Sequence, residues 1–357
     1  MEYYWKKKTI VSFVLALLVV FIHTSAAAQY ILQLPDEAGK DIVRFFANIW
    51  TNTVSRVAVP LFFVISGATF FRDYKPEMYN KKLLSRVKTL LIPYLLWNTL
   101  VMCFLLLCAY TPVYKLFVGR DRFLLTLPNV INGIFFYKGN GVFWFVYNLI
   151  IYVVLTPLFD LLTSKKWLAY ISLMIALVLP LFADEAFSFV RMSSGSVVFY
   201  LIGCVIGKYR FSEFSAKFSK PARIAGVFIC AVCIVLQMLS IYNIVPLHEI
   251  AEQVLLIMFC FAFWVAMDIV AERIEVRRYM SYSFFIYVLH TDVQSVLVKI
   301  IYIIGPKKIW MAFPNLVISY CGTILSIILV ATLMEKYLPK VFSLLTGGRS
   351  QFVTKKV

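Results

Sequence analysis

Long apolar runs recur from one end of this 357-residue chain to the other, and many are close to the roughly 20 residues that a helix needs to cross a bilayer. Hydrophobic residues make up 62% of the chain and charged residues 15%. A soluble domain holds about 45–50% apolar and about 25% charged residues. The runs are continuously apolar, whereas the strands of a membrane β-barrel alternate. The sequence therefore predicts an all-α, polytopic membrane protein.

Ten segments are expected to span the membrane, with both chain ends in the cytoplasm. The positive-inside rule supports this frame, because 24 of the 35 Lys and Arg residues then fall on the cytoplasmic side. The expected membrane domain covers residues 1–345, and residues 346–357 are expected to form a short, basic cytoplasmic tail. The expected spans are 9–28, 56–71, 89–110, 142–162, 168–183, 195–207, 222–242, 254–271, 281–303 and 315–334.

The net charge of +17 does not indicate a nucleic-acid partner, because the basic residues cluster in short segments between the apolar runs. Six of them lie within residues 72–88, among them Lys82, Arg86 and Lys88. By composition, these side chains are topology charges or a contact for anionic lipid. The alternative is a binding site for a phosphate-rich cytosolic ligand. All seven cysteines fall in apolar runs, which favours neither a disulfide nor a zinc site.

Two of the three histidines lie inside apolar runs, where an unpartnered imidazole costs free energy. His23 lies fourteen residues into the first span, which places it about 21 Å from the cytoplasmic edge. His290 lies near the middle of the ninth span. Each ring is either the partner in a helix-to-helix hydrogen bond or a group that accepts and returns a proton in a cavity.

The chain resembles the acyltransferase 3 family of bacterial integral membrane proteins over nearly its full length. Five stretches carry the resemblance, and they occur in the order that the family shows. They are "LALLVVFIHTS" (15–25), "RVAVPLFFVISG" (56–67), "KKLLSRVKTLLIPYLLWN" (81–98), "GVFWFVYNLIIYVVLTPL" (141–158) and "SYSFFIYVLH" (281–290).

The resemblance implies transfer of an acyl group, often acetyl, from an acyl-CoA such as acetyl-CoA to a hydroxyl of a cell-surface or lipid-linked glycan. The acyl-CoA is then a co-substrate, with no permanently bound cofactor and no metal, and the protein belongs in the bacterial plasma (inner) membrane. His23 matches the family's essential histidine. Arg86 matches its basic residue ahead of the third span, and Arg56 lies in its second-span element.

We therefore expect Lys82, Arg86 and Lys88 to bind the phosphates of the acyl donor, and His23 to take the proton from the acceptor hydroxyl. The residues expected to bind the acceptor or to line the cavity are Arg56, Trp144, Tyr147, Asn148 and His290. Interfacial belts also contain Trp and Tyr, so the two aromatic residues of this set are equally typical of such a belt.

The sequence departs from the family pattern at two places. The family usually has an arginine eleven residues before the histidine, where this chain has Ser12. Many relatives carry an Arg-Asp pair where Tyr147 and Asn148 stand. Both departures remove charge. Two other functions stay open at this point, an exporter or flippase of glycan or lipid intermediates without covalent chemistry, and a degenerate scaffold.

Overall fold

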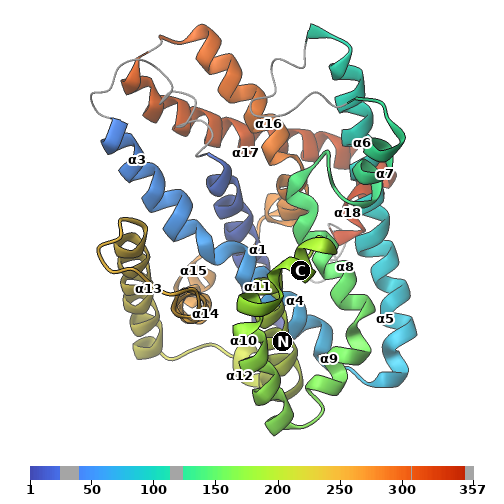
Figure 1. The fold of residues 1–357 in the computed structure, drawn as a ribbon, viewed down its shortest axis with the longest axis vertical. Coiled ribbons are helices and arrows are strands. Elements are labelled where there is room, and N and C mark those ends of the chain that lie inside the picture. The colour runs from blue at the N-terminus through green and yellow to red at the C-terminus, as the bar shows by residue number, and fades with distance from the viewer. Residues whose placement is uncertain (25–39, 113–123, 307, 350–357) are drawn as a thin grey trace. The chain divides into compact units, whose positions relative to one another are not determined.

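The computed structural model describes residues 1–24, 40–112, 124–306 and 308–349, and within these ranges the chain is helical with no strand (Figure 1). Among the described residues, seven helical segments are long and apolar enough to cross a membrane. The all-helical membrane class is thus confirmed. The count of ten spans and the cytoplasmic location of both ends stay predictions. The seven segments are Lys40–Phe71, Pro76–Ala109, Lys166–Phe189, Lys220–Ile241, Glu249–Arg273, Arg278–Ile304 and Ala312–Tyr337.

Eight of the ten expected spans overlap a helical segment of this kind, if the pair Gly141–Val154 and Thr156–Leu162, bent by 69°, counts as one crossing. The expected first span corresponds to α1 (Glu2–His23), although its residues 25–28 lie outside the described ranges. The expected sixth span corresponds to α11 (Ser194–Val205), which has only 12 residues.

Contacts divide the chain into two compact units, which we describe separately. The first unit comprises residues 1–15, 56–87 and 145–277. The second comprises residues 16–55, 88–144 and 278–357. One boundary falls inside α1, whose first turns belong to the first unit and whose last turns belong to the second.

In the first unit, α4 packs against α11, and α13 lies beside α14 (Figure 1). The crossing of α4 and α11 brings the two backbones together, because a Cβ atom on Gly67 would lie 2.5 Å from the carbonyl oxygen of Tyr200. The helices wholly or largely in this unit are α4 (Ala58–Phe71), α5 (Tyr79–Arg86), α8 (Trp144–Val154), α9 (Thr156–Leu162), α10 (Lys166–Phe189), α11, α12 (Phe211–Ser215), α13 (Lys220–Ile241), α14 (Glu249–Ala266) and α15 (Asp268–Arg273).

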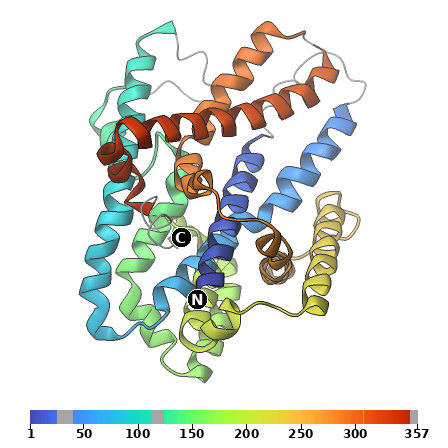
Figure 2. The same cartoon turned by 180° about the vertical axis from the view of Figure 1, so that it is seen from behind.

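In the second unit, α16 packs against the long α17, and α18 follows α17 at an angle (Figure 2). The helix α7 packs on α6, where the Tyr94 hydroxyl donates to the carbonyl oxygen of Phe135 at 2.7 Å. No span was expected at α7, because it lies in the connection between the expected third and fourth spans. The helices of this unit are α3 (Lys40–Asn48), α6 (Ile92–Ala109), α7 (Leu127–Phe135), α16 (Ser283–Ile304), α17 (Ala312–Tyr337) and α18 (Pro339–Thr346).

Short irregular helices connect or extend several of these elements. The π-helical turn Val87–Leu91 joins α5 to α6, so the basic residues before the expected third span are themselves helical. Other π-helical turns are Ile49–Thr53 and Ile206–Arg210, and the 3-10 turns are Val54–Val57, Pro76–Met78, Gly141–Phe143, Arg278–Tyr282 and Ile309–Met311.

Candidate active site

The second unit brings together the two histidines that the sequence places inside apolar runs. His23 is the last residue of α1, and His290 lies in α16. Their ring centroids are 4.9 Å apart, and the ring planes are tilted by 54°. The His290 side chain is fully buried and that of His23 is half-buried. The sequence predicts that both rings line a cavity, but it does not predict their direct contact, because each histidine was located from the apolar run around it.

Aromatic packing fixes the end of α1 that carries His23. The ring of Phe21 lies 4.1 Å from that of Tyr320 in α17 and 5.7 Å from that of Trp50, centroid to centroid. The Tyr320 hydroxyl also donates to the carbonyl oxygen of Leu17 at 3.3 Å. These contacts set the rotation of the last turns of α1 and therefore the direction of the His23 ring.

Residues 140–143 anchor the turn of α16 that carries His290. The Tyr287 hydroxyl donates to the carbonyl oxygen of Val142, and the Asn140 amide donates to that of Val288 at 3.3 Å. One ring nitrogen of His290, Nδ1, lies 2.6 Å from the carbonyl oxygen of Tyr287. These contacts hold the imidazole in one orientation.

Further buried polar groups in α16 and α17 were missed by the sequence analysis. The side chains of Gln294, Asn315 and Thr323 are almost fully buried, and each has a polar atom without a hydrogen-bond partner among the described residues. Such groups normally pair with protein, ordered water or ligand. The sequence contains a signal for the buried polar groups of α17, because polar residues occur at every fourth position, 315, 319 and 323, of an otherwise apolar run.

The basic residues expected to bind the acyl donor have different surroundings. Lys82 donates to the carbonyl oxygens of Phe70 and Arg72, which closes the C-terminal end of α4. The half-buried guanidinium of Arg86 lies 5.5 Å from the ring centroid of Phe70 and forms no hydrogen bond or ion pair with another described residue. Lys88 is exposed and belongs to the second unit.

The residues expected to bind the acceptor include three whose contacts lie within the first unit. Arg56 donates to Glu252 at 3.2 Å, and both side chains are about one-third exposed. The Tyr147 hydroxyl donates to the carbonyl oxygen of Val190 at 3.2 Å. The buried Asn148 accepts a hydrogen bond from the backbone N–H of Ser193 at 3.1 Å. Trp144 is half-buried and belongs to the second unit.

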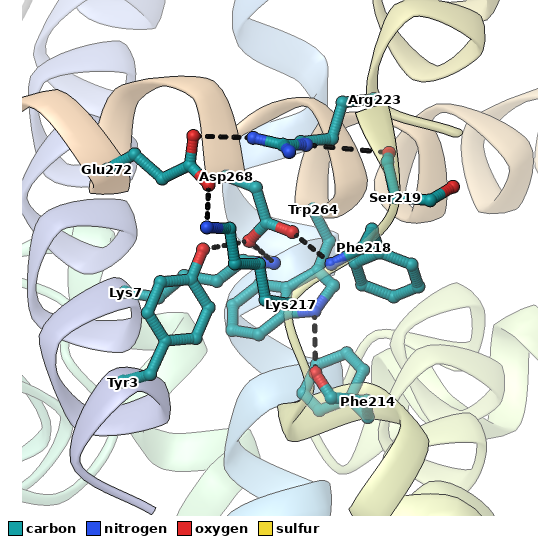
Figure 3. Close-up of polar contacts among 10 residues, drawn as sticks. All are labelled: Tyr3, Lys7, Phe214, Lys217, Phe218, Ser219, Arg223, Trp264, Asp268 and Glu272. Carbon is teal, nitrogen blue, oxygen red and sulfur yellow. Dashed lines mark hydrogen bonds and ion pairs between the residues drawn. The ribbon is translucent and has the colours of Figure 1, made fainter. Parts of the chain in front are cut away.

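A buried ion pair in the first unit, between Lys7 and Asp268, was not predicted from the sequence (Figure 3). Lys7 Nζ lies 2.6 Å from a carboxylate oxygen of Asp268 and 4.2 Å from the ring centroid of Trp264, and both charged side chains are almost fully buried. Asp268 also accepts hydrogen bonds from the Tyr3 hydroxyl at 2.6 Å and from the Phe218 backbone N–H at 2.7 Å. Burial opposes the charge of the Lys7 ammonium group, and the Asp268 carboxylate beside it favours that charge.

A groove of about 580 Å³ lies between α13 and α14, but it carries little chemistry. Its lining is almost wholly apolar and includes Leu236, Val254 and Met258, with His248 as its one titratable residue. A catalytic pocket needs several converging polar groups. The histidine pair is therefore the better candidate site.

Comparison with known proteins identifies the family. The family model for an acyltransferase domain, acyltransferase 3, matches residues 12–335. No curated protein and no solved structure matches the chain. The match covers nearly the whole chain, including the second half of α1 with His23 and all of α16 with His290. The chain therefore belongs to the acyltransferase 3 family of membrane enzymes, which transfer acyl groups.

Proposed function

We propose that this enzyme moves an acetyl group from acetyl-CoA to a hydroxyl of a cell-surface or lipid-linked glycan in the bacterial plasma membrane. The observation that carries the proposal is the contact between two imidazoles, the half-buried His23 and the buried His290, within helices of an acyltransferase family member. Ester formation needs a group that takes the hydroxyl proton, and a neutral imidazole is the side chain best suited to this near neutral pH.

His23 is the proposed general base. The acceptor oxygen attacks the thioester carbonyl, so that a C–O bond forms and the C–S bond breaks, while a ring nitrogen of His23 takes the hydroxyl proton. The imidazolium then returns this proton to the CoA thiolate. The ring lies in the last turn of α1, where the partial negative charge of the helix end favours the positive charge that forms.

Arg86 is the residue that we propose for binding the CoA phosphates, with Lys82 and Lys88 adding positive charge. A guanidinium has five N–H donors, and none of those of Arg86 is used by another described residue. Phosphate accepts such charge-assisted hydrogen bonds in a bidentate fashion. Lys82 has only part of its donor capacity committed to the end of α4.

Acceptor binding is proposed for Arg56, Trp144, Tyr147 and Asn148. Arg56 uses one guanidinium nitrogen on Glu252, which leaves its other donors for an anionic or hydroxylated sugar. The rings of Trp144 and Tyr147 offer flat apolar faces of the kind that pack on a sugar ring.

Transfer in isolated membranes tests the catalytic part of the proposal. Membrane vesicles that contain the wild-type enzyme and host glycan are expected to incorporate radiolabel from [14C]acetyl-CoA in a form released by mild alkali, as esters are. His23→Ala is expected to lower the rate by 10²–10⁴-fold, the usual contribution of a general base. A His23→Ala enzyme that transfers at the wild-type rate would refute the proposal.

Binding of acetyl-CoA to the purified enzyme tests the donor site. Affinity is expected to fall as salt is raised from 50 mM to 500 mM, because the contacts are to phosphates. Arg86→Gln is expected to weaken binding about tenfold or more and to reduce its salt dependence. Lys81→Gln is the matched control, since Lys81 is exposed in the same basic helix. Equal losses in both variants would mean that only net charge matters.

A further inference from the structure

The His290 ring is hydrogen-bonded on one side only. Its Nδ1 lies 2.6 Å from the carbonyl oxygen of Tyr287. A carbonyl oxygen has only lone pairs to offer, so Nδ1 must carry the proton in this contact. In the neutral ring the other nitrogen, Nε2, is then an acceptor. Nε2 is buried and has no hydrogen-bond partner among the described residues.

An unpartnered acceptor in this position needs an explanation. Leaving a buried polar atom without a hydrogen-bond partner costs about 1–3 kcal/mol. An apolar side chain could fill the same space without this cost. The described residues contain no cluster of three or more His, Cys, Asp or Glu around this nitrogen that could hold a metal ion. The neighbouring ring, that of His23 at 4.9 Å, offers an N–H donor.

Resting on the proposed function, we infer that His290 is a positioning residue for His23. The two rings are not hydrogen-bonded to each other in the structure, and the bond forms when the acceptor is bound, as catalytic hydrogen bonds commonly tighten in the substrate complex. The Nε2 of His290 then accepts from one ring nitrogen of His23, which keeps the proton on that nitrogen. The opposite nitrogen of His23 is then unprotonated and free to take the acceptor's hydroxyl proton. A centroid separation of 4.9 Å is short enough for facing ring nitrogens to reach the roughly 3 Å of a hydrogen bond.

The surroundings of His290 suit this role. The Tyr287 carbonyl fixes the tautomer of His290, as the hydrogen bond on one ring nitrogen fixes the role of the other. The contacts of Tyr287 with Val142 and of Asn140 with Val288 hold the backbone around it. His290 itself gains and loses no proton during transfer. A second protonated ring beside the imidazolium of His23 would be repelled by it.

Two conservative substitutions distinguish the roles of the two ring nitrogens of His290, because each preserves the hydrogen bond of only one of them. The carboxamide of Gln reaches the position of Nε2, whereas that of Asn reaches the position of Nδ1. His290→Gln therefore keeps an acceptor toward His23, and His290→Asn keeps only the donor toward Tyr287. The transfer assay with [14C]acetyl-CoA is applied to both variants, together with acetyl-CoA binding and thermal unfolding.

We expect His290→Asn to lower kcat about 10–100-fold, the usual effect of removing a group that orients a functional histidine. Its acetyl-CoA affinity and unfolding temperature should match those of the wild type. His290→Gln should retain a kcat within about threefold of the wild type. An active His290→Asn beside an inactive His290→Gln would overturn the inference and leave His290 with a structural role. Two equally active or two equally inactive variants would also overturn it.

The same assay distinguishes failure of this inference from failure of the proposed function. If His23→Ala transfers at the wild-type rate, His23 is not the general base, and the positioning role proposed for His290 is then also wrong. If His23→Ala is inactive while both His290 variants behave alike, the proposed function stands and only the positioning role is wrong.

Discussion

At the residue scale, Lys7 shows how one side chain departs from what its sequence neighbours suggest. Lys6, Lys7 and Lys8 form one basic run, yet Lys7 alone is buried and paired with Asp268. The carboxylate is satisfied three times, by Lys7, by the Tyr3 hydroxyl and by a backbone N–H. This network ties the first two turns of α1 to α15 and to the segment before α13 (Figure 3).

Removing one partner of this pair should destabilise the enzyme strongly, because the other charge is left buried. We expect Lys7→Met to cost about 3–5 kcal/mol, whereas Lys6→Met, which removes the same topology charge from a position that is only half-buried, should cost less than about 1 kcal/mol. The measurement is thermal unfolding in detergent, followed by a thiol-reactive dye that labels the buried Cys108, Cys204, Cys233 and Cys260. Equal shifts in both variants would show that Lys7 acts only through topology.

The ion pair between Lys7 and Asp268 could not be predicted from the sequence. His23 and His290 were found because a polar ring in an apolar run is conspicuous. Asp268 lies near the edge of an expected span, where an acidic residue is unremarkable. Its role depends on contacts with residues far away in the chain, and no periodic pattern records such contacts. The tautomer of His290 was unpredictable for the same reason, since it depends on one backbone carbonyl.

At the scale of elements, the crossing of α4 and α11 depends on glycine. Both helices are predictable as apolar runs, but their closeness is not, because it requires knowing which faces meet. A Cβ on Gly203 would lie within 3 Å of the Ala68 backbone nitrogen and of the Gly67 Cα. Small residues at such crossings let helix backbones touch, which is a common source of stability inside membranes.

A single added methyl group at this crossing should therefore be destabilising. We expect Gly203→Ala to cost about 1–3 kcal/mol, as overpacked positions do. Gly195→Ala in the same helix is the control, because a Cβ there would meet only the Gln253 side chain at 3.7 Å. It should be neutral or slightly stabilising, since Ala is a better helix former than Gly. The thiol-dye unfolding assay distinguishes these outcomes, and equal stability of the two variants would disprove the close crossing.

At the scale of the whole molecule, the number of crossings decides on which side of the membrane each later loop lies. The ten-span frame depends most on α11, whose 12 residues are fewer than a span requires. The π-helical turn Ile206–Arg210 follows it directly, and at 1.5 Å per residue Ser194–Arg210 is about 25 Å long. Because a bilayer can thin locally to accept a short span, we expect α11 to cross.

Cysteine labelling from outside the cell tests that crossing. In a chain whose native cysteines are replaced, Asn243→Cys should react with a membrane-impermeant thiol reagent on intact cells. Ala216→Cys should react only after the cells are permeabilised. Both positions are exposed and follow α11, so their sides would be exchanged if α11 did not cross. Ser164→Cys precedes α11 and should label only after permeabilisation in either case, which makes it the control for intact membranes. An exchanged pattern would reduce the count by one and place the C-terminal tail outside.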